Sequence, residues 1–243
     1  MDIKSEYNRL IDDVLHYLTT GFTEKKGRED LKQQLKRPDT KGMNERGKKR
    51  EKGTYTKSEQ LNKLTTEIIR CTNCPLYSSR THAVPGKGPI DAQIMFIGEA
   101  PGEVEDRTGE PFVGKAGQLL TKMIEAIQLK REDVFITNVV KCRPPNNRTP
   151  LPDEVAECFP YLVRQIELID PLIICCLGGP AASALLEADT GISKLRGTIH
   201  LYRNIAVIPT YHPAAVLRFP EKYKRSVWND LKMLRDYYRD VKK

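Results

Sequence analysis

Four polar or aromatic side chains stand where a site for a flat polar ring would need them. Glu99 follows one apolar run, Asn138 ends a second, and His212 follows another. Because the carboxyl ends of parallel strands meet at one edge of a sheet, we expect these three polar groups to converge there. Phe112 lies in the loop that begins near Glu99 and offers an aromatic face for stacking. The pattern predicts a pocket for a flat, polar ring.

That loop, residues 98 to 117, reads GEAPGEVEDRTGEPFVGKAG and is rich in carboxylates and glycines. Simpler explanations exist for each residue: the acidic run could be a solvated surface, Phe112 core, Asn138 a partner for strand-end backbone groups, and His212 an ordinary loop residue. Singly these are the commoner roles, but the shared position at one sheet edge favours a ligand site. The stretch from Gly114 to Gly117 opens a predicted helix, whose free N–H groups are candidates for holding a phosphate or orienting the pocket.

The cysteines form a second constellation. Of the six, Cys175 and Cys176 fall inside a predicted buried strand, where thiols behave as small hydrophobes. The other four comprise a C-x-x-C pair and two single residues, a set that is more often a metal site in a reducing compartment than a disulfide framework. Residue types alone favour zinc slightly over an iron-sulfur cluster, since four thiolates suit either. The candidate ligands are Cys71, Cys74, Cys142 and Cys158.

Alternating strands and helices must position these residues. Short, continuous apolar runs at residues 92–98, 134–140, 172–177 and 205–209 predict buried strands. Helical patterns cover residues 58–70, where Ser58 opens the pattern with a hydroxyl cap, and residues 115–128, 152–169, 180–189 and 221–240. This alternation predicts a three-layer α/β/α fold with a central, four-stranded, mainly parallel sheet.

Composition limits the class of protein. The chain has 243 residues, 39% hydrophobic and 30% charged, which is ordinary for a soluble protein. No run of 18 apolar residues predicts a membrane span, and the polar, acidic start is unlike a targeting peptide. We therefore expect a cytoplasmic protein, without membrane contact, that acts as a monomer.

The net charge of +8 is unevenly distributed, because residues 1–57 hold 15 Lys and Arg against 10 Asp and Glu. Within this segment, residues 3–20 show a helical apolar period, and residues 37–57 have the composition of a disordered linker. The linker is either a solvated spacer or an electrostatic arm that attracts DNA. The expected domains are residues 1–57, a helix plus basic linker, and residues 58–243, the catalytic body.

Three motifs in order, together with the four spaced cysteines, resemble the family 4 (iron-sulfur) uracil-DNA glycosylases. They are GEAPGEVEDRTGEPFVGKAGQLL, TNVVKCRPPNNRTP and YHPAAVLR, and the resemblance covers about residues 65–240. It implies a monofunctional enzyme that hydrolyses the bond between uracil and deoxyribose in single- or double-stranded DNA, which starts base excision repair. It also implies a structural 4Fe-4S cluster on the four candidate cysteines.

The resemblance further implies roles within the pocket. Phe112 would stack on an extruded uracil, Asn138 would read its Watson-Crick edge, and His212 would donate to O2. Ala100 occupies the place where the best-known branch of the superfamily has an Asp. Glu99 and Glu105 are therefore the candidates for orienting water or stabilising the sugar cation, and Glu105 could instead exclude thymine.

DNA contacts are expected mainly after His212. Val216 or Leu217 would fill the gap left by the flipped base, with Arg218 near phosphate. Arg143 and Arg148 are candidates for further backbone contacts. No Lys in the core motifs is placed as an obvious Schiff-base nucleophile, which argues against lyase activity. The competing hypothesis is a metal-stabilised DNA-binding module without catalysis.

Overall fold

The computed structural model describes residues 55–242 of the chain. The predicted helix at residues 3–20 and almost all of the predicted linker lie outside this part. No helix among the described residues is long and apolar enough to cross a membrane.

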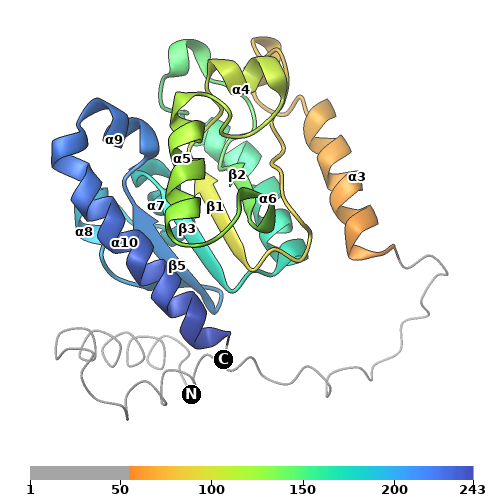
Figure 1. Cartoon of the computed structure of the whole chain (residues 1–243). Helices are drawn as coiled ribbons and strands as arrows, with labels where there is room; N and C mark the ends of the chain where they lie inside the picture. The colour runs from red at the N-terminus through yellow and green to blue at the C-terminus, as the bar shows by residue number, and fades with distance from the viewer. Residues whose placement is uncertain (1–54, 243) are drawn as a thin grey trace, which may run out of the picture. The chain divides into compact units, whose positions relative to one another are not determined.

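A five-stranded sheet forms the centre of the fold, in the order β2-β1-β3-β5-β4 (Figure 1). Its strands are β1 (Ile94–Gly98), β2 (Phe135–Asn138), β3 (Ile173–Leu177), β4 (His200–Tyr202) and β5 (Ile205–Thr210). All neighbours pair in parallel except β4 and β5, which pair antiparallel. The four predicted strands and the mainly parallel arrangement are confirmed, but the predicted number of strands was wrong by one.

The additional strand, β4, was not predicted because it contains no continuous apolar run. It is three residues long and lies at the edge of the sheet, where its side chains are half-buried or exposed. A tight turn at Arg203 and Asn204, both with positive φ of 47° and 68°, joins it to β5. Turns of this handedness match the twist of a hairpin, but they are usually signalled by Asn-Gly or Asp-Gly.

The central strands are buried on both faces, which explains their continuous apolar sequence. In β1, Ile94 and Phe96 join one apolar cluster while Met95 and Ile97 join another. Helices α5 (Lys115–Ala126) and α10 (Pro220–Val241) cover the first face, and α6 (Pro152–Ile169) and α7 (Gly179–Leu186) cover the second (Figure 1). Both faces of a parallel sheet require such cover. Cys175 and Cys176 point to opposite clusters, as expected for buried hydrophobic thiols.

Helix α3 (Lys57–Arg70) packs on α6 and starts one residue before the predicted position. Its cap is Thr56 rather than Ser58, because the Thr56 hydroxyl accepts from the Glu59 N–H and the Glu59 carboxylate binds back to the Thr56 N–H.

Several short helices were not predicted. Helix α4 (Glu103–Thr108) lies inside the acidic loop, and its acidic first turn suits the positive end of a helix dipole. It ends at Gly109, which has φ 74°. The others are α8 (Ile192–Leu195), α9 (Pro213–Arg218), and the 3-10 turns η2 (Pro75–Ser78), η3 (Arg131–Asp133) and η4 (Pro145–Asn147).

Candidate active site

A cavity of about 410 Å³ opens at the carboxyl edge of the sheet. The chain reverses its direction of travel across the sheet between β1 and β3, and such switch points are where open α/β sheets bind ligands. The cavity size is typical of a small-molecule site. Eight of the predicted site residues line it: Glu99, Ala100, Glu105, Phe112, Asn138, Arg148, His212 and Arg218. The predicted convergence of distant segments is therefore observed.

Phe112 is buried and holds a left-handed backbone conformation, with φ 53°. For a bulky residue this geometry costs about 1–3 kcal/mol, and such strain is concentrated at functional sites. Two glycines accommodate it. A Cβ on Gly117 would lie 1.8 Å from the Phe112 carbonyl oxygen, and a Cβ on Gly98 would lie 2.5 Å from the Phe112 Cζ. The ring is thus fixed against the end of β1 and the first turn of α5.

Asn138 ends β2 with its side chain almost completely buried. Its Oδ1 is the one buried side-chain polar atom in the described part of the chain that has no hydrogen-bond partner. Buried acceptors normally find a donor, so an unpaired one in a cavity indicates a ligand group. Gly98 makes this position possible, since a Cβ there would lie 2.4 Å from Oδ1.

His212 faces the same cavity and is neutral. Its Nδ1 accepts a hydrogen bond from the Ala214 N–H at 3.1 Å, which caps α9 and leaves the proton on Nε2. Burial lowers the pKa of His212 to about 4, although the Glu105 charge opposes this shift. The His212 ring centroid lies 5.6 Å from that of Phe112. The site therefore offers a neutral N–H donor beside an aromatic face.

The two candidate carboxylates differ in their surroundings. Burial raises the pKa of Glu99, while a hydrogen bond with Thr149 opposes the shift. Glu105 instead accepts from the Val113 and Gly114 N–H groups at 2.9 and 2.8 Å through Oε1. It therefore holds the backbone that follows Phe112. The expectation of free N–H groups at Gly114 was wrong there, because the Gly114 N–H is bonded to this carboxylate.

The acidic run is not uniformly solvated. The Asp106 carboxylate is buried and accepts from the Thr81 N–H, whereas the side chain of Glu103 is 62% exposed. In this loop, Glu103 and Glu110, whose side chains are 62% and 48% exposed, are the carboxylates that lie on the surface.

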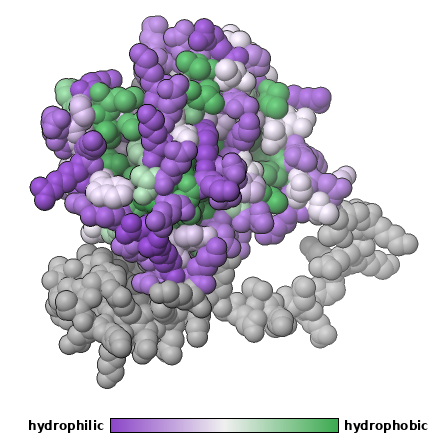
Figure 2. Space-filling view, in the orientation of Figure 1, coloured by the Kyte–Doolittle hydropathy of each residue, from purple (hydrophilic) through white to green (hydrophobic). Residues whose placement is uncertain are grey.

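The residues predicted to contact DNA after His212 differ in exposure. Val216 is 7% exposed and packs in the apolar cluster beneath α9, so it cannot act as a wedge without leaving the core. Leu217 is 48% exposed and Phe219 51% exposed, and both lie at the end of α9. Figure 2 shows apolar surface at this end of the molecule among hydrophilic surroundings. Phe219 was not predicted as a DNA contact. An aromatic residue directly after Leu217-Arg218 could have indicated it.

The two other candidate arginines have partners within the protein. Arg148 binds both oxygens of the Glu154 carboxylate, at 2.8 and 2.7 Å, and Glu154 in turn accepts from the Leu151 N–H at the start of α6. Arg143 donates to Asn147 Oδ1 at 2.8 Å. Both arginines order the loop between β2 and α6 before any DNA is bound.

The four candidate cysteine ligands line one small cavity between α3, the loop after β2, and α6. Three N–H groups point at its sulfurs: Arg80 Nη1 lies 3.0 Å from Cys142 Sγ, the Lys141 N–H 3.2 Å from Cys158 Sγ, and the Asn73 N–H 3.5 Å from Cys71 Sγ. As placed, no three His, Cys, Asp or Glu side chains in the described residues could hold a single metal ion.

Sequence reasoning overlooked two polar residues near the site. Asn147 lines the cavity at the carboxyl edge of the sheet and has φ 54°. Its position in a Pro-Asn-Asn turn is the sequence feature that could have indicated it. Lys141 is completely buried in the loop after β2, beside Asn138. No signal in the sequence separates it from an exposed lysine.

Comparisons with known proteins agree with this geometry. Residues 85–232 match the family described as the Uracil DNA glycosylase superfamily. A Type-4 uracil-DNA glycosylase of Saccharolobus solfataricus is 52% identical over 171 residues, 67% of this chain and 79% of that protein. One of Archaeoglobus fulgidus is 50% identical over 171 residues, covering 67% and 86%. One of Thermotoga maritima is 45% identical over 186 residues, covering 75% and 97%. The chain therefore belongs to the uracil DNA glycosylase superfamily and, within it, to the type-4 uracil-DNA glycosylases.

Proposed function

We propose that the protein is a monofunctional uracil-DNA glycosylase that hydrolyses the bond between uracil and deoxyribose in single- or double-stranded DNA. The product is an abasic site, the first intermediate of base excision repair. The observation that carries the proposal is the unpaired, buried Asn138 Oδ1 in a cavity that also contains an aromatic face and a neutral histidine N–H. The cytoplasmic location and the monomeric state remain predictions.

Base recognition follows from the hydrogen-bonding groups of the cavity. Uracil must leave the base stack to be reached, and a pocket can then read its Watson-Crick edge. Asn138 Oδ1 accepts from uracil N3–H, and the same amide donates to O4, a pairing that cytosine does not offer. Phe112 stacks on the ring, which contributes about 1–3 kcal/mol. Gly98 leaves the space that both side chains occupy.

Bond cleavage leaves negative charge on the departing uracil. The His212 Nε2–H is oriented by the hydrogen bond at Nδ1, so it can donate to uracil O2 as charge develops there. A donor that is already neutral and fixed needs no proton transfer or reorganisation during the step. The sugar becomes cationic. We assign the attacking water to Glu99, because Glu105 is already bound to backbone N–H groups. Glu105 positions Phe112 through its backbone bonds.

The proposed roles of Glu99 and His212 predict an acidic limb in the pH profile. Glu99 must be ionised to orient water, and its raised pKa places the loss of rate above the ordinary glutamate value of 4.5 as pH falls. His212, with a pKa of about 4, stays neutral over that range. Single-turnover excision rates between pH 4.5 and 8 should show this limb, and Glu99→Gln should lower the rate and abolish the limb. A limb that persists in Glu99→Gln would assign it to another group.

The central test of the function uses Asn138→Asp on oligonucleotides that contain one uracil or one cytosine in a mispair. A carboxylate can accept from the cytosine N4 amino group, so the variant should excise uracil more slowly and gain some excision of cytosine. Alkaline cleavage after single-turnover reactions measures both. Retained discrimination in a folded variant would remove Asn138 as the base reader. If the folded wild-type protein binds uracil DNA without excising the base, the non-catalytic DNA-binding module becomes the better explanation.

DNA binding is proposed for the exposed end of α9. Leu217 is the wedge that replaces the extruded base, and Arg218, which lines the cavity, contacts phosphate. Phe219 extends the apolar edge beside Leu217. Arg143 and Arg148 remain candidates for backbone contacts through the N–H groups that their protein partners leave free.

A 4Fe-4S cluster is proposed for the cysteine cavity, held by Cys71, Cys74, Cys142 and Cys158. Four thiols around one cavity, with N–H donors directed at three of the sulfurs, suit thiolate ligands of a cluster. Bound there, the cluster would join α3, the loop after β2 and α6 as a structural crosslink.

Removing one ligand should therefore destabilise the protein more than it alters chemistry. We expect Cys158→Ala to lose iron and visible absorption and to unfold at a lower temperature, because metal binding free energy contributes to folding. Cys176→Ala is the matched control, since Cys176 is also buried but lies in β3 and does not line the cavity. Full iron content in Cys158→Ala would exclude Cys158 as a ligand.

A further inference from the structure

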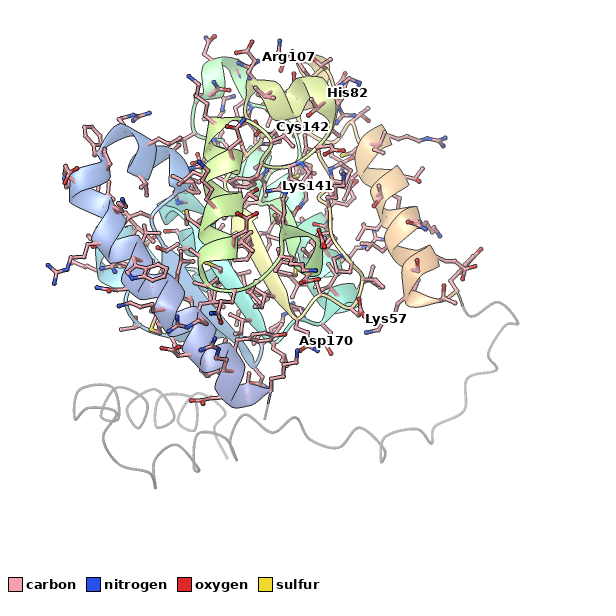
Figure 3. The ribbon with its side chains drawn as sticks, viewed as in Figure 1. Lys57, His82, Arg107, Lys141, Cys142 and Asp170 are labelled. Carbon is pink, nitrogen blue, oxygen red and sulfur yellow. The ribbon has the colours of Figure 1, made fainter. Side chains whose placement is uncertain are left out.

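Lys141 has a completely buried side chain that the proposed chemistry does not use. Its Nζ lies 2.7 Å from Thr137 Oγ1, 2.6 Å from the Asn138 carbonyl oxygen, and 2.7 Å from Gln165 Oε1. These three oxygens surround the amino group, and they match the three N–H donors that it has when protonated. Figure 3 places Lys141 in the interior, close to Cys142. A buried polar group is costly unless it is hydrogen-bonded, and Nζ meets that requirement here.

The three acceptors belong to different parts of the fold. Thr137 and Asn138 end β2, whereas Gln165 lies on α6. Gln165 Nε2 and Thr137 Oγ1 also reach the Pro85 carbonyl oxygen, at 2.7 and 3.0 Å. The Lys141 backbone N–H meets Cys158 Sγ, again on α6. Lys141 thus connects the end of β2, which carries Asn138, with α6, which carries the candidate cluster ligand Cys158.

The orientation of Asn138 depends on its backbone, because its buried Oδ1 has no partner within the described protein. Two bonds hold the peptide that follows it. The Val139 N–H donates to the Gly98 carbonyl oxygen at 2.9 Å, and the Asn138 carbonyl oxygen accepts from Lys141 Nζ. Loss of the second bond would free the peptide to tilt, and the side chain would tilt with it.

We propose that Lys141 is a positioning residue for base recognition: its Nζ fixes the Asn138 peptide and thereby aims the Asn138 amide at uracil. The inference rests on the proposed function. Lys141 lines the cysteine cavity rather than the uracil cavity, so it acts through Asn138 and touches no reacting atom. It also links the cysteine site to the base reader, because its backbone N–H meets Cys158 Sγ and its Nζ binds the Asn138 carbonyl oxygen.

A double-mutant cycle tests the proposal. Lys141→Met keeps an unbranched side chain one atom shorter and removes all three bonds. In an otherwise wild-type protein we expect it to slow single-turnover uracil excision about 10- to 100-fold and to weaken free uracil binding, since small misplacements of a binding group have effects of that size. In an Asn138→Ala background the same change should slow excision less than about threefold, because the group that Lys141 positions is already absent.

Asp230→Asn is the matched control, because it also changes a buried polar side chain that is hydrogen-bonded within the protein. Asp230 lies on α10, where it pairs with Arg196 and accepts from Thr210, and both of these contacts are remote in sequence from β2. Its effects should therefore be equal in the two Asn138 backgrounds. Iron content, visible absorption and melting temperature are measured on every variant with its cofactor. They distinguish a slow rate caused by loss of the cluster from one caused by a misplaced Asn138 side chain.

The outcomes are distinct. Equal losses for Lys141→Met in both backgrounds would overturn the positioning role and leave Lys141 as a stabilising residue. If Lys141→Met does not fold, Thr137→Val applies the same cycle more mildly, because it removes one of the three acceptors. If the wild-type protein shows no uracil excision at all, the proposed function is wrong. If the wild-type protein excises uracil and Lys141→Met has the same effect in both Asn138 backgrounds, only the positioning role is wrong.

Discussion

Replacing His212 with alanine should lower the single-turnover rate of uracil excision by about 10²- to 10³-fold, the usual cost of losing one preorganised donor to a developing anion. The Nε2–H is held toward the cavity by the Nδ1 bond to the Ala214 N–H, and burial keeps the ring neutral. The loss should fall on the chemical step. Affinity for DNA containing an abasic site, measured by fluorescence anisotropy, should change far less.

His212→Asn supplies the control, because His212 also caps α9. Asparagine is a good N-cap residue, so it can retain the bond to the Ala214 N–H while losing the longer reach of Nε2. This variant should melt close to the wild type and still be slow in excision. A comparable loss of rate and of DNA affinity in both variants would assign His212 to docking rather than to the leaving uracil.

Gly98→Ala should disturb both base-contacting side chains with a single added methyl group. The added Cβ would lie 2.4 Å from Asn138 Oδ1 and 2.5 Å from Phe112 Cζ, so the base reader and the stacking ring must both move. Displacement of a positioning group by about 1 Å can cost 10²-fold in rate. We therefore expect uracil excision to fall at least about 10²-fold and inhibition by free uracil to weaken in parallel.

Gly179→Ala is the corresponding control. It adds the same methyl group at the start of α7, where the nearest neighbour, Ile192 Cβ, is at an ordinary contact distance of 3.8 Å. It should leave excision within about twofold of the wild type, since it touches nothing in the cavity. Normal excision by Gly98→Ala would show that the pocket rearranges freely, which contradicts a preorganised reader.

The elements that sequence reasoning located share a strong physical signal. Strands β1, β2, β3 and β5 are buried on both faces, so their apolar runs are continuous, and α6 was predicted with the bounds observed. The elements it missed have weak signals. Strand β4 is an exposed edge strand, and α4 has six residues whose acidic composition resembles a solvated loop. Such short elements depend on their neighbours more than on their own sequence.

The candidate site shows the same division. Residue types and order were sufficient to place Glu99, Phe112, Asn138 and His212 around one cavity, because parallel strands deliver their carboxyl ends to one edge. Val216 and Leu217 were equivalent in sequence, and only packing buried one and exposed the other. Lys141 was not recognised because burial of a lysine depends on acceptors from residues 137, 138 and 165.

The sequence by itself determined the parallel α/β scaffold, the four spaced cysteines and the types of side chain at the sheet edge, since each follows from local periodicity and composition. Tertiary structure alone decided which carboxylate is bound to backbone N–H groups, which histidine nitrogen keeps its proton, and which amide oxygen is left unpaired. These properties arise from contacts between segments that are distant in the chain. Free energies of burial and hydrogen bonding depend on those contacts and therefore cannot be obtained from residue order.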